Sequence, residues 1–312
     1  MKDLTKGNVY KNLTGFAIPI LAGNLLQLTY NAVDSIVVGR YAGEAALAAV
    51  GICGPVMSIV VLGASGISIG ASAFMGQCYG AKRMKELKQA FASVMLLSLA
   101  LSFVILAACM IFCHPLLGIL QVPEEAYELT EGYLRIVLLS FPFTFLYNVL
   151  TASLRSIGDS RTPIVFLGIS CVINVVLDVV FVRQFSMSAA GAGIATLIAE
   201  GISCILCMVH VYRNVPVFSL GRNEWRPDWK IMKTILQNGS VTAFQQLMQP
   251  IGKVLIQGCI NGYGISVIAA FNAVNRVDDF ACIPEQSISH AIMNYTSQCD
   301  GAGDRGKMKE GF

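Results

Sequence analysis

The sequence predicts an all-α integral membrane protein with about eight transmembrane helices, and three observations lead to this fold class. Hydrophobic residues make up 55% of the 312 residues, whereas charged residues make up only 13%, about half of the roughly 25% found in soluble domains. The charges are clustered, which leaves long uncharged runs at 45–81, 89–113 and 136–154. Each run is close to or longer than the ~20 apolar residues with which a helix crosses a bilayer core.

Eight segments along the chain fit this description. In chain order, the predicted helices are 14–38, 51–78, 90–113, 134–154, 163–182, 190–212, 235–259 and 265–296. We expect a six-helix N-terminal lobe at 1–213, a cytoplasmic connector at 214–234, and an incomplete C-terminal lobe at 235–312 that holds its first two helices.

The basic residues alternate from one connection to the next. The N-terminus and the loops after even-numbered helices hold 17 Lys and Arg residues, whereas the loops after odd-numbered helices hold only Arg40 and Arg183. Because basic loops stay on the cytoplasmic side, the N-terminus is predicted to be cytoplasmic. The loop after the third helix has no basic residue and is predicted to be external. It carries Glu124, Glu125, Glu128 and Glu131.

The chain also repeats itself with an offset of 221 residues. Residues 77–81 read QCYGA and residues 298–302 read QCDGA, and each copy ends a predicted helix and enters a basic loop. The last two helices therefore begin a second copy of the first six, in the same orientation. Such repeats are typical of transporters, whose substrate path lies between the two copies. With two of six expected helices in the second copy, we expect residues 1–312 alone not to transport.

Four motifs carry a family resemblance. Residues 31–36 read NAVDSI, 77–81 read QCYGA, 154–163 read LRSIGDSRTP and 296–303 read TSQCDGAG. In this order they resemble the signature segments of the multidrug and toxic compound extrusion family, whose two loops read LRGxGDxxxP and TAQNxGAG. The resemblance implies two six-helix lobes in the cell (plasma or inner) membrane. It also implies an antiporter that exports amphipathic or cationic drugs and toxins in exchange for Na⁺ or H⁺.

Carboxylates inside predicted helices are candidate functional groups, because each costs roughly 2.5–3.5 kcal/mol on insertion scales. Asp34 and Asp178 both fall about five residues before the outer end of their helix, roughly 7–8 Å below that surface. Asn174 shares the helix face of Asp178, and Thr196 mirrors Asp178 across the hairpin around Met187. These oxygens suit Na⁺ or a proton. The resemblance implies that all four form the coupling-cation site, with Asp34, Asn174 and Asp178 as the ligands of Na⁺.

Further residues are candidates for bending a helix or lining a cavity. Pro19 lies inside the first helix, where its missing N–H favours a kink; the resemblance adds that this helix bends when the acidic site changes its occupancy. Glu200 lies one turn inward of Thr196 and could line the cavity, as could Gln245, Gln246 and Arg276. Lys253 and Arg276 could pair with acidic residues of the last helix, which are Asp278, Asp279 and Glu285.

Other functions remain open. A flippase for lipid-linked precursors would share the fold, but flippases of that kind carry several basic residues in the central cavity, whereas this first lobe is acidic inside. An embedded enzyme is less favoured, because Asp278 and Asp279 are not part of a DDxxD motif. A passive channel fits poorly with buried carboxylates and a repeat. We expect an organic cation or drug and the lipid bilayer as partners, no nucleic acid, no cofactor besides Na⁺ or H⁺, and a monomer.

Overall fold

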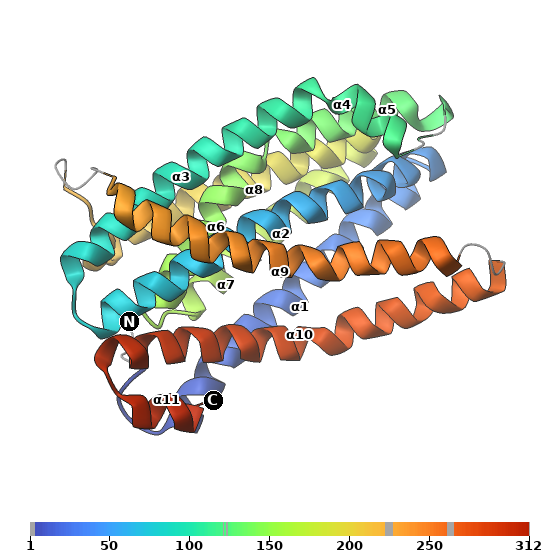
Figure 1. Ribbon diagram of the computed structural model, residues 1–312. Helices are drawn as coiled ribbons and strands as arrows, with labels where there is room; N and C mark the ends of the chain where they lie inside the picture. Colours follow the sequence, from blue (N-terminus) through green and yellow to red (C-terminus); the bar gives the residue numbers. More distant parts are fainter. Residues whose placement is uncertain (1–3, 121, 123, 222–226, 261–264, 312) are drawn as a thin grey trace.

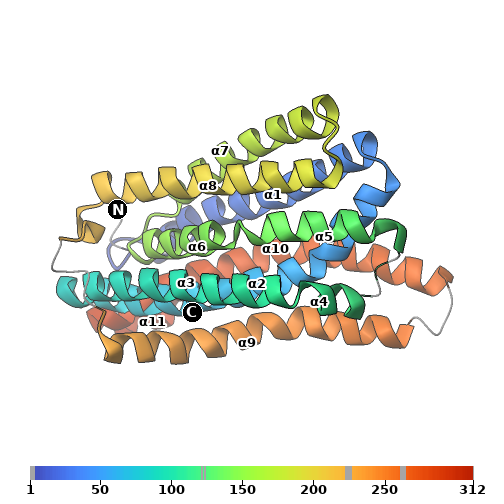
Figure 2. The ribbon, with the colours of Figure 1, turned by 90° about the horizontal axis from the view of Figure 1, so that it is seen from above.

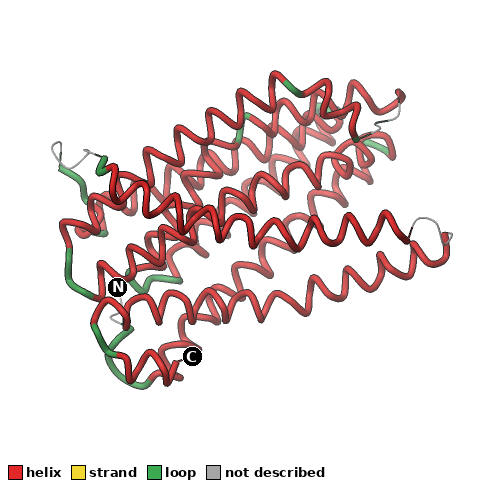
Figure 3. The backbone as a smooth tube through the Cα atoms, in the orientation of Figure 1, coloured by secondary structure: helices red, strands yellow, loops and turns green. Residues whose placement is uncertain are grey.

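The computed structural model describes the chain except for a few short segments, and these are residues 1–3, 121, 123, 222–226, 261–264 and 312. The described residues are mostly helical and contain no strand (Figure 3). The long helices run side by side along one common direction (Figures 1 and 2). The predicted all-α class is therefore confirmed.

The helices follow one another through short connections. Their bounds are α1 Val9–Tyr41, α2 Glu44–Gly80, α3 Met84–Ile111, α4 Cys113–Ile119, α5 Glu124–Leu138, α6 Phe141–Ser156, α7 Arg161–Asp178, η1 Val179–Gln184, α8 Ser188–Asn214, η2 Pro216–Phe218, α9 Trp229–Ile260, α10 Ile265–Ala302 and α11 Arg305–Gly311. All eight predicted helices fall within this series. The seventh begins at Trp229 rather than at 235, inside the predicted connector.

Five described helices are long and apolar enough to cross a membrane: α1, α2, α3, α7 with η1, and α8. The pair α5 and α6 would be a sixth span, bent by 43°. The helices α9 and α10 lie at the places predicted for the seventh and eighth spans, but their composition does not mark them as membrane helices. The count of eight therefore stays a prediction.

One part of the sequence prediction is wrong, because much of the region predicted as an acidic external loop is helical. The helix α5 starts at Glu124, so Glu128 and Glu131 lie on a helix rather than in a loop. Acidic residues near a helix N-terminus are favourable, and the buried residues Ala126 and Thr130 between them face the bundle. The predicted helix 134–154 is correspondingly the end of α5 followed by α6.

The bend between α5 and α6 has a local cause in Pro142. Its ring removes the N–H that would bond to the carbonyl of Leu138. The N–H groups of Leu139 and Ser140 bond three residues back, to Ile136 and Val137, instead of four. The chain thus changes direction in the middle of this predicted helix.

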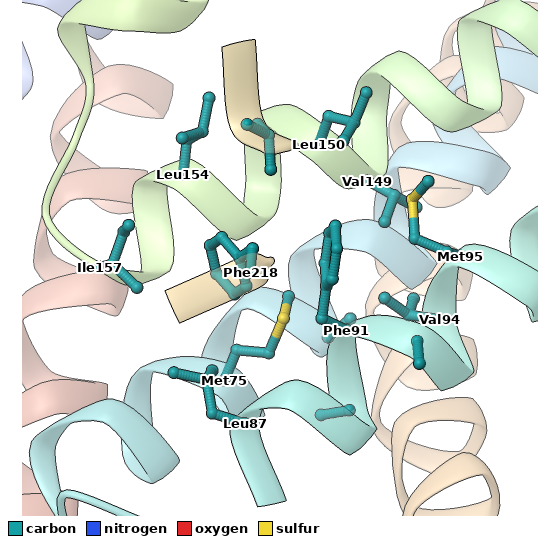
Figure 4. Close-up of a cluster of buried hydrophobic side chains, with 14 of the residues drawn as sticks. Met75, Leu87, Phe91, Val94, Met95, Val149, Leu150, Leu154, Ile157 and Phe218 are labelled. Atoms are coloured by element: carbon teal, nitrogen blue, oxygen red, sulfur yellow. The ribbon is translucent and has the colours of Figure 1, made fainter. Parts of the chain in front are cut away.

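Two apolar clusters fill the bundle that α1–α8 form. One lies between α2, α3, α6, α8 and η2, and Met75, Phe91, Leu150, Leu154 and Phe218 are among its buried residues (Figure 4). The other lies toward the opposite end, around Phe141 and Leu134.

The helices α9 and α10 run antiparallel to each other, and both pack against α2 (Figure 1). Backbone meets backbone there: a Cβ on Gly66 would overlap the backbone of Ala243, and a Cβ on Gly70 would overlap that of Gly239. Close approach of this kind is possible only at small residues.

The crossing of α2 and α10 follows the repeat seen in the sequence. A Cβ on Gly80 would overlap the carbonyl oxygen of Gln298, and a Cβ on Gly301 would overlap that of Gln77. Each contact maps onto the other with the offset of 221 residues. The side-chain nitrogen of Gln298 also donates to the carbonyl of Ser156 at 2.7 Å, which ties the crossing to α6.

Candidate functional site

A cavity of ≈ 760 Å³ lies among α1, α2, α5, α6, α7 and α8. The polar side chains on its wall come mainly from α1, α6 and α8. They include Tyr30, Asp34, Tyr133, Thr144, Tyr147, Asn148, Thr196 and Glu200. Among the described residues that line it, Asp34 and Glu200 are the ones with a formal charge, and none is Lys, Arg or His. The wall is therefore negative.

Asp34 of α1 and Asp178 of α7 bring their carboxyl groups within hydrogen-bonding reach of each other. Asp178 is fully buried, whereas Asp34 also lines the cavity. One oxygen of each carboxyl group, Oδ1 in both cases, is buried without a hydrogen-bond partner among the described residues. Buried polar atoms are rarely left unpaired, so this pair of oxygens is arranged for a cation or a proton.

Asn174 and Thr196 complete the group. The Asn174 amide nitrogen donates to Asp178 Oδ2 at 2.9 Å, and its oxygen accepts from the backbone N–H of Thr196 at 3.3 Å, in the amide orientation that gives both atoms a partner. Asn174 is fully buried. The structure thus brings together the four residues that the sequence singled out as a cation site; their role as ligands stays a prediction.

The backbone around Asp178 departs from a regular helix. The chain passes from α7 into the π-helical turn η1, which starts at Val179 directly after the carboxylate. Such turns are rare and occur frequently at functional sites. The residues themselves predict one regular helix over 163–182 and carry no signal for this change.

Two residues of the site were missed. The Tyr30 hydroxyl is a hydrogen-bonding neighbour of Thr196. Tyr30 precedes Asp34 by four residues on the same helix. The Thr144 hydroxyl of α6 donates to Glu200 Oε2. A hydroxyl group costs little free energy in a membrane helix, so these two residues did not stand out in the sequence. The spacing of four residues between Tyr30 and Asp34 could have suggested the first.

Other predicted residues lie elsewhere. Gln245 and Gln246 are on α9 and are not among the residues that line this cavity. The side chains of Arg276 and Asp279 lie outside the described part of the chain. Pro19 lies inside α1, which continues through it from Val9 to Tyr41, so its kink stays a prediction.

One question of pairing is answered by the structure. Lys253 Nζ lies 3.5 Å from Asp278 Oδ2, and the two side chains remain 30% and 50% exposed. The ion pair links α9 to α10, away from the cavity, so Asp278 belongs to the packing of these two helices rather than to the acidic group.

Comparisons with known proteins agree with this architecture. A model of the MatE family matches residues 19–180. The "Probable multidrug resistance protein YpnP" of Bacillus subtilis (strain 168) is 30% identical, over 98% of this chain and 68% of its own length. The chain belongs to the MatE family. It is accordingly a multi-pass membrane transporter of a multidrug efflux family and not an enzyme.

Further MatE proteins support the assignment. The "Probable multidrug resistance protein YoeA" of Bacillus subtilis (strain 168) is 28% identical over 98% of this chain and 68% of its own length. The solved outward-facing conformation of a multidrug resistance MATE family transporter of the MOP superfamily aligns with a TM-score of 0.92 and 24% identity. That alignment covers 99% of this chain and 68% of the solved chain, and it shows the MatE fold. The present chain thus spans about two thirds of the length of these proteins.

Proposed function

We propose that this MatE protein exports amphipathic or cationic compounds in exchange for Na⁺ or H⁺ bound between Asp34 and Asp178. The observation that supports the proposal most is the pair of carboxyl groups in contact, each with one unpartnered buried oxygen, beside a cavity inside the membrane. Two carboxylates this close repel each other unless a cation or a shared proton lies between them.

The position of the pair explains how an ion could control the shape of the protein. Asp34 is on α1, whereas Asp178 and Asn174 are on α7 and Thr196 is on α8. An occupied site holds α1 to α7 and α8, and an empty site lets the two carboxylates push α1 away. Pro19 interrupts the hydrogen bonds of α1 and is the place at which this helix bends in response.

The wall of the cavity supports the choice of substrate. Its two carboxylates and the absence of basic residues among the described lining residues favour a cation. Apolar residues such as Met57 and Leu167 share the wall and suit an amphipathic body. The names of the relatives, which are multidrug resistance proteins, point the same way. An anionic lipid-linked precursor would find no counter-charge on this wall.

The remaining expectations belong to the same proposal. The excess of basic residues in alternate connections supports an N-terminus in the cytoplasm, and the family resemblance supports residence in the plasma or inner membrane. The protein acts as a monomer with Na⁺ or H⁺ as its coupling ion, and it needs neither a cofactor nor a nucleic acid.

The experiment measures uptake of ethidium into everted membrane vesicles, which corresponds to efflux from the cell, under an imposed Na⁺ or pH gradient. The vesicles contain these residues within a protein of the full length of the relatives that they match. Asp34→Asn and Asp178→Asn should each abolish the gradient-driven part, because the amide removes a negative charge without changing the shape. Glu44→Gln, an exposed residue at the start of α2, is the matched control and should leave efflux unchanged. Undiminished gradient-driven efflux by both variants at normal expression would refute the coupling site.

The same vesicles identify the coupling ion. A Na⁺ jump at constant pH drives efflux if Na⁺ fills the site, and a pH jump without Na⁺ drives it if a proton does. Efflux that follows neither gradient would contradict antiport.

A further inference from the structure

A further carboxylate lines the cavity, that of Glu200, and it does not belong to the pair of Asp34 and Asp178. Glu200 lies on α8 one turn from Thr196, which corresponds to about 6 Å along the helix axis. Its carboxylate accepts a hydrogen bond from the Thr144 hydroxyl, and the Ser140 hydroxyl lies beside it. Thr144 is on α6 and Ser140 directly precedes that helix, so Glu200 is fixed against a different wall than Asp34, which is on α1.

The surroundings of Glu200 suit an organic cation better than a metal ion. Tyr30, Tyr133 and Tyr147 line the same cavity, and the first two lie within electrostatic range of Glu200. Aromatic rings attract cations through their electron-rich faces and at the same time present apolar surface. In addition, Asn148 lines the cavity, and its side-chain nitrogen is buried without a partner among the described residues. That nitrogen can donate to a polar group of a bound compound.

The carboxyl groups at the cavity can balance the charge of two cations. Asp34 already faces Asp178, so one ion or proton serves both of these groups. Glu200 has no basic neighbour among the described lining residues, and a buried charge needs a counter-charge. The wall therefore offers one place to a small ion and a second place, one helical turn away, to a larger cation.

We propose that Glu200 binds the cationic group of the exported compound, while Asp34 and Asp178 hold the coupling ion. This inference rests on the proposed function and adds to it a substrate-binding residue. The compound it fits is a monovalent organic cation with an apolar body. Because the two positive charges lie close together, each weakens the binding of the other, and the effect is equal in both directions.

The test measures equilibrium binding of radiolabelled tetraphenylphosphonium and of uncharged chloramphenicol to the purified 312-residue chain in detergent. Glu200→Gln should weaken tetraphenylphosphonium binding by at least about tenfold, as expected for the loss of a buried charge partner. It should change chloramphenicol binding less than about twofold, because the shape of the cavity is kept. Glu44→Gln makes the same chemical change at an exposed site and should alter neither.

A second variant guards against misfolding of the first. Thr144→Val keeps the Glu200 charge and removes the hydroxyl that positions it, so it should weaken tetraphenylphosphonium binding by a smaller factor and again spare chloramphenicol. Equal losses for both compounds, or unchanged tetraphenylphosphonium binding in both variants, would overturn the inference. A selective loss in either folded variant supports it.

The design separates this inference from the proposed coupling site. Raising Na⁺, or lowering the pH, should weaken tetraphenylphosphonium binding in the unaltered protein, and Asp34→Asn should remove that dependence while tight binding remains. If neither ion has any effect but Glu200→Gln still loses the cation selectively, the coupling site fails and the role of Glu200 stands. If Asp34→Asn instead causes the selective loss, Asp34 binds the compound and the role of Glu200 is refuted.

Discussion

The helix α2 is held by its two sets of neighbours in different ways. Toward α3, α5 and α6 it packs side chain against side chain, as Met75 does in the cluster with Leu150 and Phe91 (Figure 4). Toward α9 and α10 it packs backbone against backbone, at Gly66, Gly70 and Gly80 among others. Side chains can change rotamer to absorb a substitution, whereas backbones in contact cannot. The two contacts should therefore differ sharply in their tolerance of small changes.

The largest effect is expected at the crossing of α2 and α10. Gly80→Ala places a Cβ where the Gln298 carbonyl lies, and we expect a loss of about 3 kcal/mol in the free energy of unfolding, near the upper end for overpacking. Gly63→Ala on the same helix is the matched control, since a Cβ there meets nothing within 4 Å. It should stabilise the protein by about 0.5–1 kcal/mol. Equal effects in reversible unfolding in mixed micelles would show that the crossing is not tight.

A somewhat smaller effect is expected from Gln298→Ala. Gln298 is fully buried, donates to the carbonyl of Ser156 at 2.7 Å and accepts from the N–H of Leu4 at 3.1 Å. Removing the amide leaves both groups unpaired, which costs about 1–3 kcal/mol. Unfolding in mixed micelles measures it. A loss confined to a few tenths of a kcal/mol would indicate that water replaces the amide at this end of the bundle.

The side-chain cluster should tolerate a substitution better than the crossing of α2 and α10 does. Leu150→Met conserves volume at a fully buried position of the cluster, so the expected loss is below about 1.5 kcal/mol. The informative comparison is with Gly80→Ala, which adds a single methyl group. If Leu150→Met proves the more damaging of the two, the distinction between the two packing modes is wrong.

The smallest effect is expected for the ion pair between α9 and α10. Asp278→Asn weakens a contact to Lys253 whose side chains are 50% and 30% exposed, and such pairs contribute about 0–1 kcal/mol. The variant should retain gradient-driven efflux, in contrast to Asp34→Asn. Loss of ion coupling in Asp278→Asn would place a second ion site on α10.

Much of the site around Asp34 and Asp178 could be predicted, because the depth of a residue in a membrane helix follows from counting residues. Asp34 and Asp178 lie at the same distance from the ends of their apolar runs, and the short hairpin after Asp178 places Thr196 opposite. The Glu200 contact could not be predicted in the same way. It depends on Thr144 of α6, whose place beside α8 is set by the bend at Pro142, and no count of residues gives the angle of a bend.

Charged residues are a poor guide to where a helix of this protein begins. Four glutamates between two apolar runs suggested a loop, yet Glu128 and Glu131 belong to α5 because the residues between them pack on the bundle. The π-helical turn after Asp178 had no sequence signal either, since Val179 and Val180 fit a regular helix equally well. Tertiary contacts decide both cases, and they are not local properties of the chain.

The glycine crossing of α2 and α10 has a consequence for how the gene can vary. The two positions, 80 and 301, face the carbonyls of Gln298 and Gln77, and only a hydrogen atom fits at either. Every amino acid that a single-base change can substitute for glycine carries a Cβ. No missense mutation at either codon can therefore leave this contact intact, and a change at one cannot be offset by shrinking the other, which already has no side chain. Inherited variation should thus be scarce at both codons, however freely the apolar positions around them drift.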